Sequence, residues 1–179
     1  MDVVVNGSRD ALQFKGDGLF DRNADKPRNR AKLELIARIL RDELACYVHG
    51  EGSTLPTGCN ANLVVIDALQ VEGHTDSDGS DAHNMDLSAR RGAAVYTVMV
   101  AAAPEILAFK NLRSQPILSV AGYGKGRPIR ENNSDEAKDA NRRIDLRLIM
   151  FSPTEEKFVP QNLSHLVELL WTLQPNAAR

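Results

Sequence analysis

The sequence predicts an α+β fold, a two-layer sandwich in which helices cover one face of a four-stranded mixed sheet. Two observations predict it. Segments with apolar residues at helical spacing alternate with strand-like segments, in the order strand, helix, strand, helix, strand, short helix, strand, helix. The last strand segment alternates apolar and polar residues, which is typical of a sheet with one buried and one wet face. Helices confined to a single face of the sheet satisfy that pattern.

One domain is expected to span residues 1–179, with a core at about 11–151 and a C-terminal helical extension at 152–179. A chain of 179 residues can bury one well-packed core, and no linker, internal repeat or low-complexity segment divides it. The 22 basic and 24 acidic residues give a net charge of -2, so no nucleic-acid partner is expected. No segment approaches the roughly 20 apolar residues of a membrane span, and the opening MDVVVNGSRD does not resemble a signal peptide.

The N-terminal third is predicted to contain a short strand and a long helix. Leu12 and Phe14 share one face of an alternating segment at 11–14. From Arg28 to about Gly50 the apolar residues recur at spacings of three and four, which predicts a helix with one buried stripe. The stripe comprises Leu33, Ile36, Leu40 and Leu44, and Leu35 and Ile39 are expected to widen it.

The middle of the chain is predicted to form a strand, a helix and a further strand. Residues 62–74, NLVVIDALQVEGH, are rich in β-branched residues and alternate in their second half. A helix is expected from about Asn84 to Pro104, because proline cannot continue it. The segment ILSVAGYG at 117–124 predicts the next strand.

The C-terminal third is predicted to contain a short helix, the clearest strand and a closing helix. Ser134 can cap a helix whose first turn is acidic. The segment NRRIDLRLIM at 141–150 alternates, and its two faces carry Ile144, Leu146, Leu148 and Met150 against Arg143, Asp145, Arg147 and Ile149. The second of these faces is expected to be wet. Leucines at helical spacing predict a helix at 162–173.

Two cysteines, Cys46 and Cys59, flank a loop rich in glycine, proline, serine and threonine. They could form a disulfide, which would stabilise the fold by about 3 kcal/mol. They could equally be two free thiols in a reducing compartment. The two residues alone leave both interpretations open.

The stretch EGHTDSDGSDAHNMDLSARR at 72–91 crowds acids and two histidines ahead of a double arginine. Its candidate metal ligands are His74, Asp76, Asp78, Asp81, His83 and Asp86. Counted from Asp76, Gly79 is fourth and Leu87 twelfth, which does not match a calcium loop, and the histidines lack the spacing of a zinc helix. No metal and no cofactor are therefore expected. A metal-dependent hydrolase using the two histidines with Asp76 and Asp78 is kept as an alternative function.

Helical geometry singles out Arg91. Residues four apart lie on one face of a helix, so His83, Leu87 and Arg91 form a line that continues into an apolar stripe. A guanidinium beside a core needs a partner, because an unpaired buried charge is costly. Asp76, at the end of the preceding strand, is the candidate. The two could form a structural salt bridge, or Arg91 could grip a carboxylate while Asp76 receives an ammonium group.

The second of these interpretations predicts a binding site for a zwitterion. His83 and Asn84 would supply hydrogen bonds at its rim, and Leu87 an apolar contact. No serine or cysteine lies with an identifiable base and orienting acid, so no enzyme is expected. A purely structural interaction domain, in which Asp76 and Arg91 only bridge each other, is the other alternative.

Three segments resemble the OmpA/MotB-like peptidoglycan-binding domain family, in order and at matching distances. VEGHTDSDGSDAHNMDLSARRGAAV matches the family's G-H-T-D turn and N-x-x-L-S-x-R-R helix. GLFDRNADKP at 18–27 resembles its early Phe-Asp loop, and GYGKGRPIRENNSDEAKDANRRIDLRL at 122–148 resembles its G-x-G turn, loop and N-R-R strand. The resemblance covers 12–151 and implies the βαβαβ(α)β fold of OmpA C-terminal domains.

The resemblance implies non-covalent binding of peptidoglycan through the diaminopimelate of its stem peptide. Asp76 and Arg91 match the family residues that hold the charged groups of diaminopimelate. Further residues that match the family's groove are Phe20, Asp21, Asn84 and Leu87, together with Arg142 or Arg143, of which Arg143 is assigned to the site. His83 stands where the family often has tyrosine.

The segment LQFKGDGLFDRNADK at 12–26 looks more like the MotB-type stator branch than like a porin tail. That branch includes flagellar stators and the Zorya anti-phage stator protein, which the sequence does not separate, and a wall-anchoring lipoprotein or porin stays open. The branch implies a periplasmic domain of an inner-membrane protein, a homodimer, and a channel-forming stator partner reached through an N-terminal transmembrane segment outside this chain. Because the family is exported, the resemblance favours a disulfide between Cys46 and Cys59.

Overall fold

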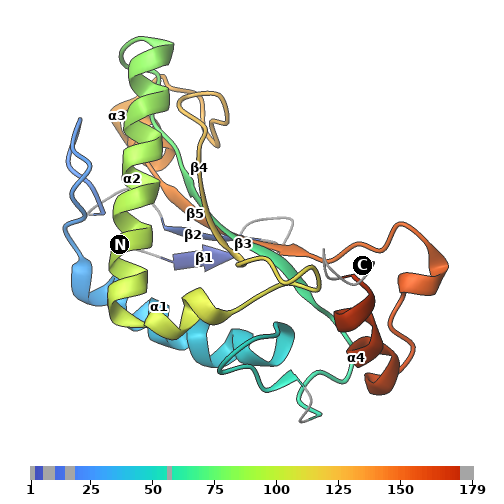
Figure 1. Ribbon diagram of the computed structural model, residues 1–179. Coiled ribbons are helices and arrows are strands. Elements are labelled where there is room, and N and C mark those ends of the chain that lie inside the picture. Colours follow the sequence, from blue (N-terminus) through green and yellow to red (C-terminus); the bar gives the residue numbers. More distant parts are fainter. Residues whose placement is uncertain (1–2, 6–10, 15–18, 56–57, 174–179) are drawn as a thin grey trace.

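The computed structural model describes residues 3–5, 11–14, 19–55 and 58–173. Helices α1 and α2 pack together on one face of a sheet, and α4 lies apart from them at one end (Figure 1). The strands are β1 (Val3–Val5), β2 (Ala11–Phe14), β3 (Ile66–Gly73), β4 (Leu118–Gly122) and β5 (Ile144–Met150). The helices are α1 (Arg30–Leu44), α2 (Asp81–Ala102), α3 (Asp135–Asn141) and α4 (Leu163–Thr172), with 3-10 turns η1 (Ala45–Tyr47), η3 (Pro104–Ala108) and η4 (Glu156–Phe158).

The sheet is mixed and has the strand order β1-β2-β5-β3-β4. β3 pairs in parallel with β4 and antiparallel with β5, and β2 pairs antiparallel with β5. These four strands are the predicted ones, so the α+β class and the mixed sheet with helices are confirmed. β1 adds a fifth strand at the edge, antiparallel to β2. The sequence does not predict it, because three consecutive valines carry no alternation.

The main core lies between the sheet and the pair α1 and α2. One face of α1 points into the core, and its buried residues are Leu33, Ala37, Leu40 and Leu44. Leu35 and Ile39 do not widen this stripe as expected, because they are 51% and 49% exposed. Each follows a buried residue by two positions, which places it about 200° round the helix on the solvent side.

The face of β5 opposite the helices, which the sequence predicts to be wet, is buried at its N-terminal end, half-buried at Arg147 and exposed only at Ile149. Arg143 and Asp145 are only 4% and 1% exposed, and Glu72 and His74, at the end of neighbouring β3, are also buried. Nε of Arg143 lies 3.1 Å from both carboxylate oxygens of Asp145, and Nε of Arg147 donates to Glu72 at 2.8 Å. Pairing of opposite charges makes such burial tolerable. Alternation along a strand therefore reports the polarity of a face and not its exposure. We call these five residues the buried charge cluster.

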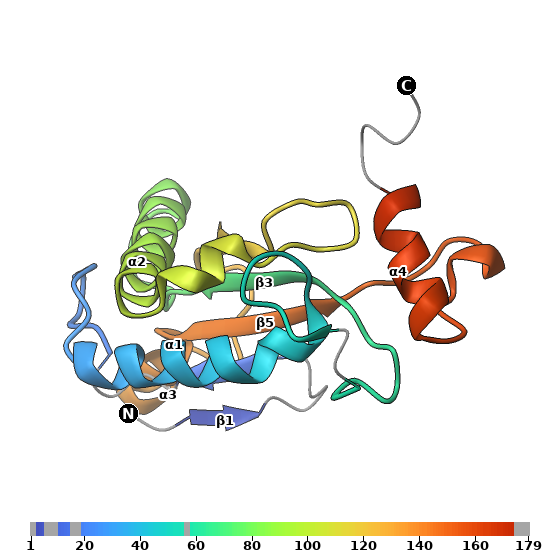
Figure 2. The same cartoon turned by 60° about the horizontal axis from the view of Figure 1, so that its bottom comes forward.

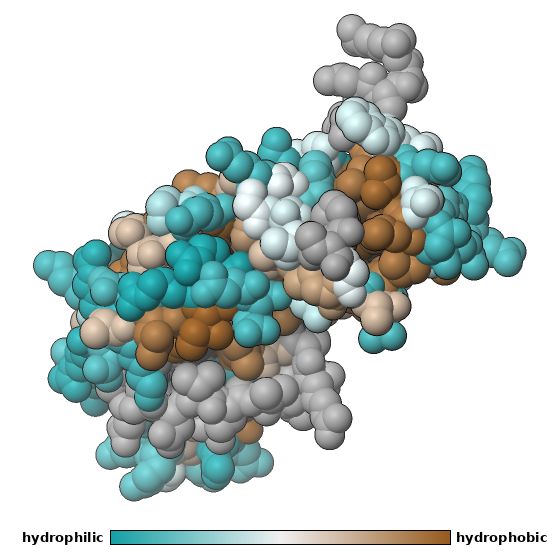
Figure 3. Space-filling view, turned by 90° about the horizontal axis from the view of Figure 1, so that it is seen from below, coloured by the Kyte–Doolittle hydropathy of each residue, from teal (hydrophilic) through white to brown (hydrophobic). Residues whose placement is uncertain are grey.

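A second, smaller core attaches α4 to segments beside the sheet. Leu166 packs with Leu55 and Val65, which both precede β3, and with Leu112, which precedes β4. In Figure 2, α4 stands beyond the end of β5, outside the helix layer formed by α1 and α2. Figure 3 shows hydrophobic side chains gathered at this end of the molecule. Among the described ranges, no helix combines the length and apolar character needed to cross a bilayer.

Cys46 and Cys59 form a disulfide that closes a loop with a sequence separation of 13 residues. Replacing both cysteines by serine should lower the free energy of unfolding by about 3 kcal/mol, because the cross-link restricts the unfolded chain. Urea denaturation at pH 7 would measure the loss. Wild-type protein treated with a reductant should fall to the same value as the double variant, and equal stability of all three samples would contradict the prediction.

Candidate binding site

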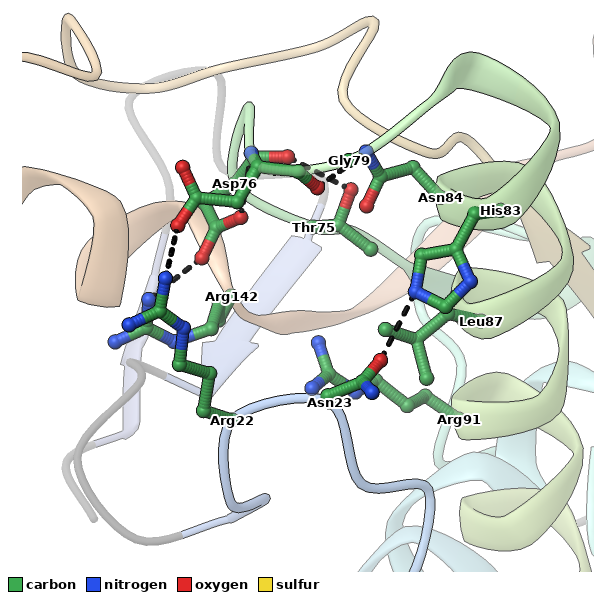
Figure 4. Close-up of a pocket in the computed structure, with 11 residues that line it drawn as sticks. Arg22, Asn23, Thr75, Asp76, Gly79, His83, Asn84, Leu87, Arg91 and Arg142 are labelled. Carbon is green, nitrogen blue, oxygen red and sulfur yellow. Dashed lines mark hydrogen bonds and ion pairs between the residues drawn. The ribbon is translucent and has the colours of Figure 1, made fainter.

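A pocket of about 260 Å³ lies where the turn after β3 meets the start of α2 and the loop that precedes α1. Five of the eight predicted site residues line it, namely Asp76, His83, Asn84, Leu87 and Arg91. In Figure 4, His83, Leu87 and Arg91 project from α2 on one side of the pocket, and Asp76 and Arg142 lie on the other side. The line of residues four apart on α2 therefore faces the pocket, as helical geometry predicts.

The acidic turn between β3 and α2 is folded by its own hydrogen bonds. Oδ1 of Asp76 accepts the backbone N–H of Asp78 at 2.9 Å, and the Ser80 hydroxyl oxygen accepts the backbone N–H of His83 as the N-cap of α2. Nδ2 of Asn84 donates to the carbonyl oxygen of Asp78. Aspartate and serine commonly stabilise turns and helix starts in this way. The turn thus fixes the carboxylate of Asp76 beside the first turns of α2.

Arg91 is the largest side chain that is fully buried, at 1% exposure. Nε donates to the carbonyl oxygen of Ala24 at 2.8 Å, and Nη2 donates to that of Asp21 at 3.1 Å. The guanidinium carbon lies 5.1 Å from the centre of the Phe20 ring. Nη1 has no hydrogen-bond partner within the described part of the chain. Burial, followed by repulsion from Arg142, lowers the pKa of Arg91 to about 10, so it stays charged at neutral pH.

Asp76 pairs with Arg142 and not with Arg91. Nη1 of Arg142 donates to Oδ2 of Asp76 at 2.6 Å, and its Nη2 donates to Asp139. Among the described residues no ion pair joins Asp76 to Arg91, although the two line the same pocket. The salt bridge considered from the sequence is therefore not formed. The carbonyl groups of the loop before α1 hold Arg91 instead.

Charged and polar side chains of that loop reach across the rim of the pocket. Nη2 of Arg22 lies 2.6 Å from Oδ2 of Asp78, and Nζ of Lys138 lies 2.7 Å from Oδ1 of the same carboxylate. The hydrogen bond from Lys138 holds the pKa of Asp78 below its usual range. Oδ1 of Asn23 lies 2.9 Å from Nε2 of His83. The loop before α1 and the start of α2 are thus joined on both sides of the pocket.

Three predicted residues lie outside the pocket lining. The ring of Phe20 supports Arg91 from the core, and the carboxylate of Asp21 turns away to pair with Arg28. Arg143 belongs to the buried charge cluster on the opposite face of the sheet. The arginine at the pocket is therefore Arg142 and not Arg143, because the latter already follows the alternation of β5.

Six lining residues are absent from the predicted set, and these are Arg22, Asn23, Thr75, Asp78, Gly79 and Arg142. Each lies within three positions of a residue that the sequence does select, in the Phe-Asp loop, after the G-H-T-D turn or in the N-R-R segment. Closeness to a motif residue is the signal that could have found them. Periodicity could not, because all six lie in loops or at the end of a short helix.

The residues of the hydrolase alternative are not brought together. His74 lies in the buried charge cluster, whereas Asp78 and His83 stand at the pocket rim. Within the described ranges, the one group of three side chains close enough to hold a metal ion is Glu72, His74 and Asp145. Arg147 and Arg143 already donate hydrogen bonds to the carboxylates of Glu72 and Asp145, respectively. Positive charge at these positions opposes a cation, so the geometry does not support a metal site.

Residues 59–142 match the OmpA family. The chain contains an OmpA-family domain. Outer membrane porin F of Pseudomonas aeruginosa is 40% identical over 75 residues, the peptidoglycan-associated lipoprotein of Pseudomonas putida 33% over 90, and the Zorya protein ZorB of Escherichia coli O139:H28 29% over 89. These matches cover 42%, 49% and 50% of this chain. The chain spans 19%, 45% and 35% of the respective relatives, less than half of each.

Two solved structures share the fold of this OmpA-family domain. The cell wall anchor of the type VI secretion system (T6SS) from Pseudomonas aeruginosa matches with a TM-score of 0.56 at 21% identity, covering 82% of this chain and 87% of that chain. The periplasmic domain of Helicobacter pylori MotB (residues 78-256) matches with a TM-score of 0.54 at 20% identity, covering 90% and 84%. At such identities the likeness concerns the fold alone.

Proposed function

We propose that this OmpA-family domain binds peptidoglycan non-covalently, through the diaminopimelate residue of the stem peptide. The observation that carries the proposal is the guanidinium of Arg91, which is fully buried at the base of the pocket and has an unpaired Nη1 within the described structure. A buried donor without a partner is costly, and a carboxylate would satisfy it with a charge-assisted bond.

The remaining lining fits the other parts of diaminopimelate. The free end of this residue carries an ammonium group beside its carboxylate, and Asp76 offers a negative charge on the side of the pocket opposite α2. Leu87 provides an apolar wall for the methylene chain, and Asn84 and His83 offer polar groups at the rim. One anion receptor, one cation receptor and one apolar wall make a zwitterion the best-matched ligand.

We further propose that binding anchors a membrane complex to the cell wall in the periplasm. The support comes from relatives: a peptidoglycan-associated lipoprotein, a cell wall anchor of a secretion system, a periplasmic MotB domain and ZorB. A stator complex, flagellar or of the Zorya type, is the assembly that the MotB and ZorB similarities favour. In that assembly the domain would work as a homodimer beside a channel-forming membrane partner. It acts by holding its ligand and performs no chemistry.

Purified sacculi would test the ligand. The protein should sediment with sacculi that contain diaminopimelate and stay in solution with sacculi whose stem peptides carry lysine, because lysine lacks the terminal carboxylate that Arg91 requires. EDTA should leave sedimentation unchanged, in contrast to what the hydrolase alternative requires. Equal sedimentation with both wall types would exclude diaminopimelate as the recognised group.

A further inference from the structure

We propose that Arg142 is an internal competitor for the ligand, because its guanidinium holds Asp76 at the position that the ligand ammonium must use. The inference rests on the proposed function and adds a residue that sets affinity and specificity within the same pocket. Arg142 comes from the junction of α3 and β5, outside the helix that carries the anion receptor.

The hydrogen bonds of Asp76 define the competition. Its Oδ1 is occupied by the backbone N–H of Asp78 at 2.9 Å, and its Oδ2 by Nη1 of Arg142 at 2.6 Å. Asp76 is only 5% exposed, which restricts the directions from which a further donor can approach. An ammonium group therefore has to share or replace the bond from Arg142.

Arg142 has a second carboxylate partner, with which it can stay paired when it releases Asp76. Its Nη2 donates to Asp139, one turn earlier in α3, while its Nη1 holds Asp76. A guanidinium offers five N–H groups in a planar fork, so one carboxylate can take both ends of the fork. When the ligand ammonium takes Asp76, Arg142 can remain paired through Asp139 alone. The exchange then leaves no charge uncompensated.

The alternative role for Arg142, a second receptor for the ligand carboxylate, fits the contacts less well. Both Nη atoms of Arg142 already donate to carboxylates, whereas Nη1 of Arg91 is unpaired in the described structure. Burial alone would lower the pKa of Arg142, but hydrogen bonds to Asp76 and Asp139 outweigh it and raise the pKa. Arg91 has a lowered pKa, so it gains more from an incoming anion.

Two synthetic peptides can separate these roles. The first is L-Ala-γ-D-Glu-meso-diaminopimelate, and the second carries 2-aminopimelate, which keeps the terminal carboxylate but lacks the ammonium group beside it. Isothermal titration calorimetry should show that Arg142→Gln binds the first peptide about fivefold more tightly than wild type, and gains nothing for the second. Thermal melting would verify that each variant is folded.

Asp139→Asn is the matched variant with the opposite expected sign. Without Asp139, the whole fork of Arg142 is committed to Asp76, so the diaminopimelate peptide should bind about fivefold more weakly. In the double variant with Arg142→Gln, the loss caused by Asp139→Asn should disappear, because the two residues act through one contact.

The outcomes test the role of Arg142 separately from the binding function of the pocket. Weaker binding of both peptides by folded Arg142→Gln would make Arg142 an anion receptor and overturn the inference. Unchanged affinity for the diaminopimelate peptide would overturn it too, while leaving the proposed function intact. A wild-type protein that binds neither peptide would remove the proposed function and the role of Arg142 together.

Discussion

Arg91→Met is expected to weaken binding of the diaminopimelate peptide roughly 100-fold, or about 3 kcal/mol, while changing the thermal midpoint by no more than about 3 °C. The large loss follows because Arg91 supplies the buried donor that would face the ligand carboxylate. Calorimetric titration of the peptide, with a thermal melt of the same sample, measures both quantities.

Stability should survive the substitution because the burial of Arg91 is itself unfavourable. Its lowered pKa has burial as the first cause, and an apolar side chain of similar length removes that cost. The loss comprises two hydrogen bonds to the carbonyl groups of Asp21 and Ala24 and the cation–π contact with Phe20, against which a methionine side chain can also pack. Asp21 and Ala24 lie in a loop that solvent reaches, so water can replace the bonds.

The neighbouring arginine provides the control. Arg90 is about half exposed and pairs with Asp86 and Asp25 on the outside of α2. Arg90→Met removes the same charge one residue away and should bind the peptide as wild type does. Binding by Arg91→Met at wild-type strength, or an equal loss in both variants, would show that Arg91 is not the anion receptor.

The sequence predicts the fold correctly wherever the spacing of apolar residues matches the pattern of burial. Leu33 and Leu40 of α1, and Ile144 and Leu146 of β5, repeat at the helix and strand periods and lie in the core. The opposite face of β5 could not be read in this way. Its burial depends on pairing across strands, between Arg147 and Glu72, and residues 75 positions apart carry no local signal.

In the site, too, spacing predicts which residues share a face of one helix, but it does not predict contacts between distant segments. Helical spacing places Leu87 and Arg91 on one face, and both line the pocket. Asp76 also lines it, but its partner could not be read from spacing, because Arg142 comes from a different part of the chain, 66 positions away. Arg142 and Arg143 lie at the junction of α3 and β5. Neither the helix period nor the strand period determines which side chain faces the pocket at such a junction. Spacing therefore does not decide between Arg142 and Arg143.

The buried charge cluster connects the fold to the site. His74 immediately precedes Thr75 and Asp76, and its backbone N–H donates to the carbonyl oxygen of Arg143 at 3.0 Å. Its ring stacks on Tyr123 at 5.4 Å and lies 3.3 Å from Oδ2 of Asp145. The end of β3, and with it the turn that carries Asp76, is therefore positioned by charges on the far face of the sheet. Acid that neutralises those charges should loosen the site.

Acid is accordingly expected to remove about 3 kcal/mol of stability through Glu72 alone. Burial would raise the pKa of Glu72, but the nearby imidazole of His74, at 3.8 Å, and the hydrogen bonds from Arg147 outweigh it and lower the pKa from 4.5 to about 2. Between these values the folded protein binds fewer protons than the unfolded chain, so stability falls as the pH falls. The contribution is complete above about pH 4.5 and is lost toward pH 2.

Comparison with Glu72→Gln isolates this contribution from that of the other carboxylates. At pH 7 the variant should be about 3 kcal/mol less stable, because it leaves Arg147 and His74 without their buried anion. The difference from wild type, measured by urea denaturation at a series of pH values in 0.15 M salt, should shrink as the pH falls below 4.5.

Asp42→Asn is the matched control. The pKa of Asp42 is also lowered by a hydrogen bond from Arg41, but the position is exposed and screened by salt. A difference between wild type and Glu72→Gln that stays constant from pH 7 to 3 would exclude Glu72 as the titrating group and, with it, the cluster as the acid-sensitive support of Asp76.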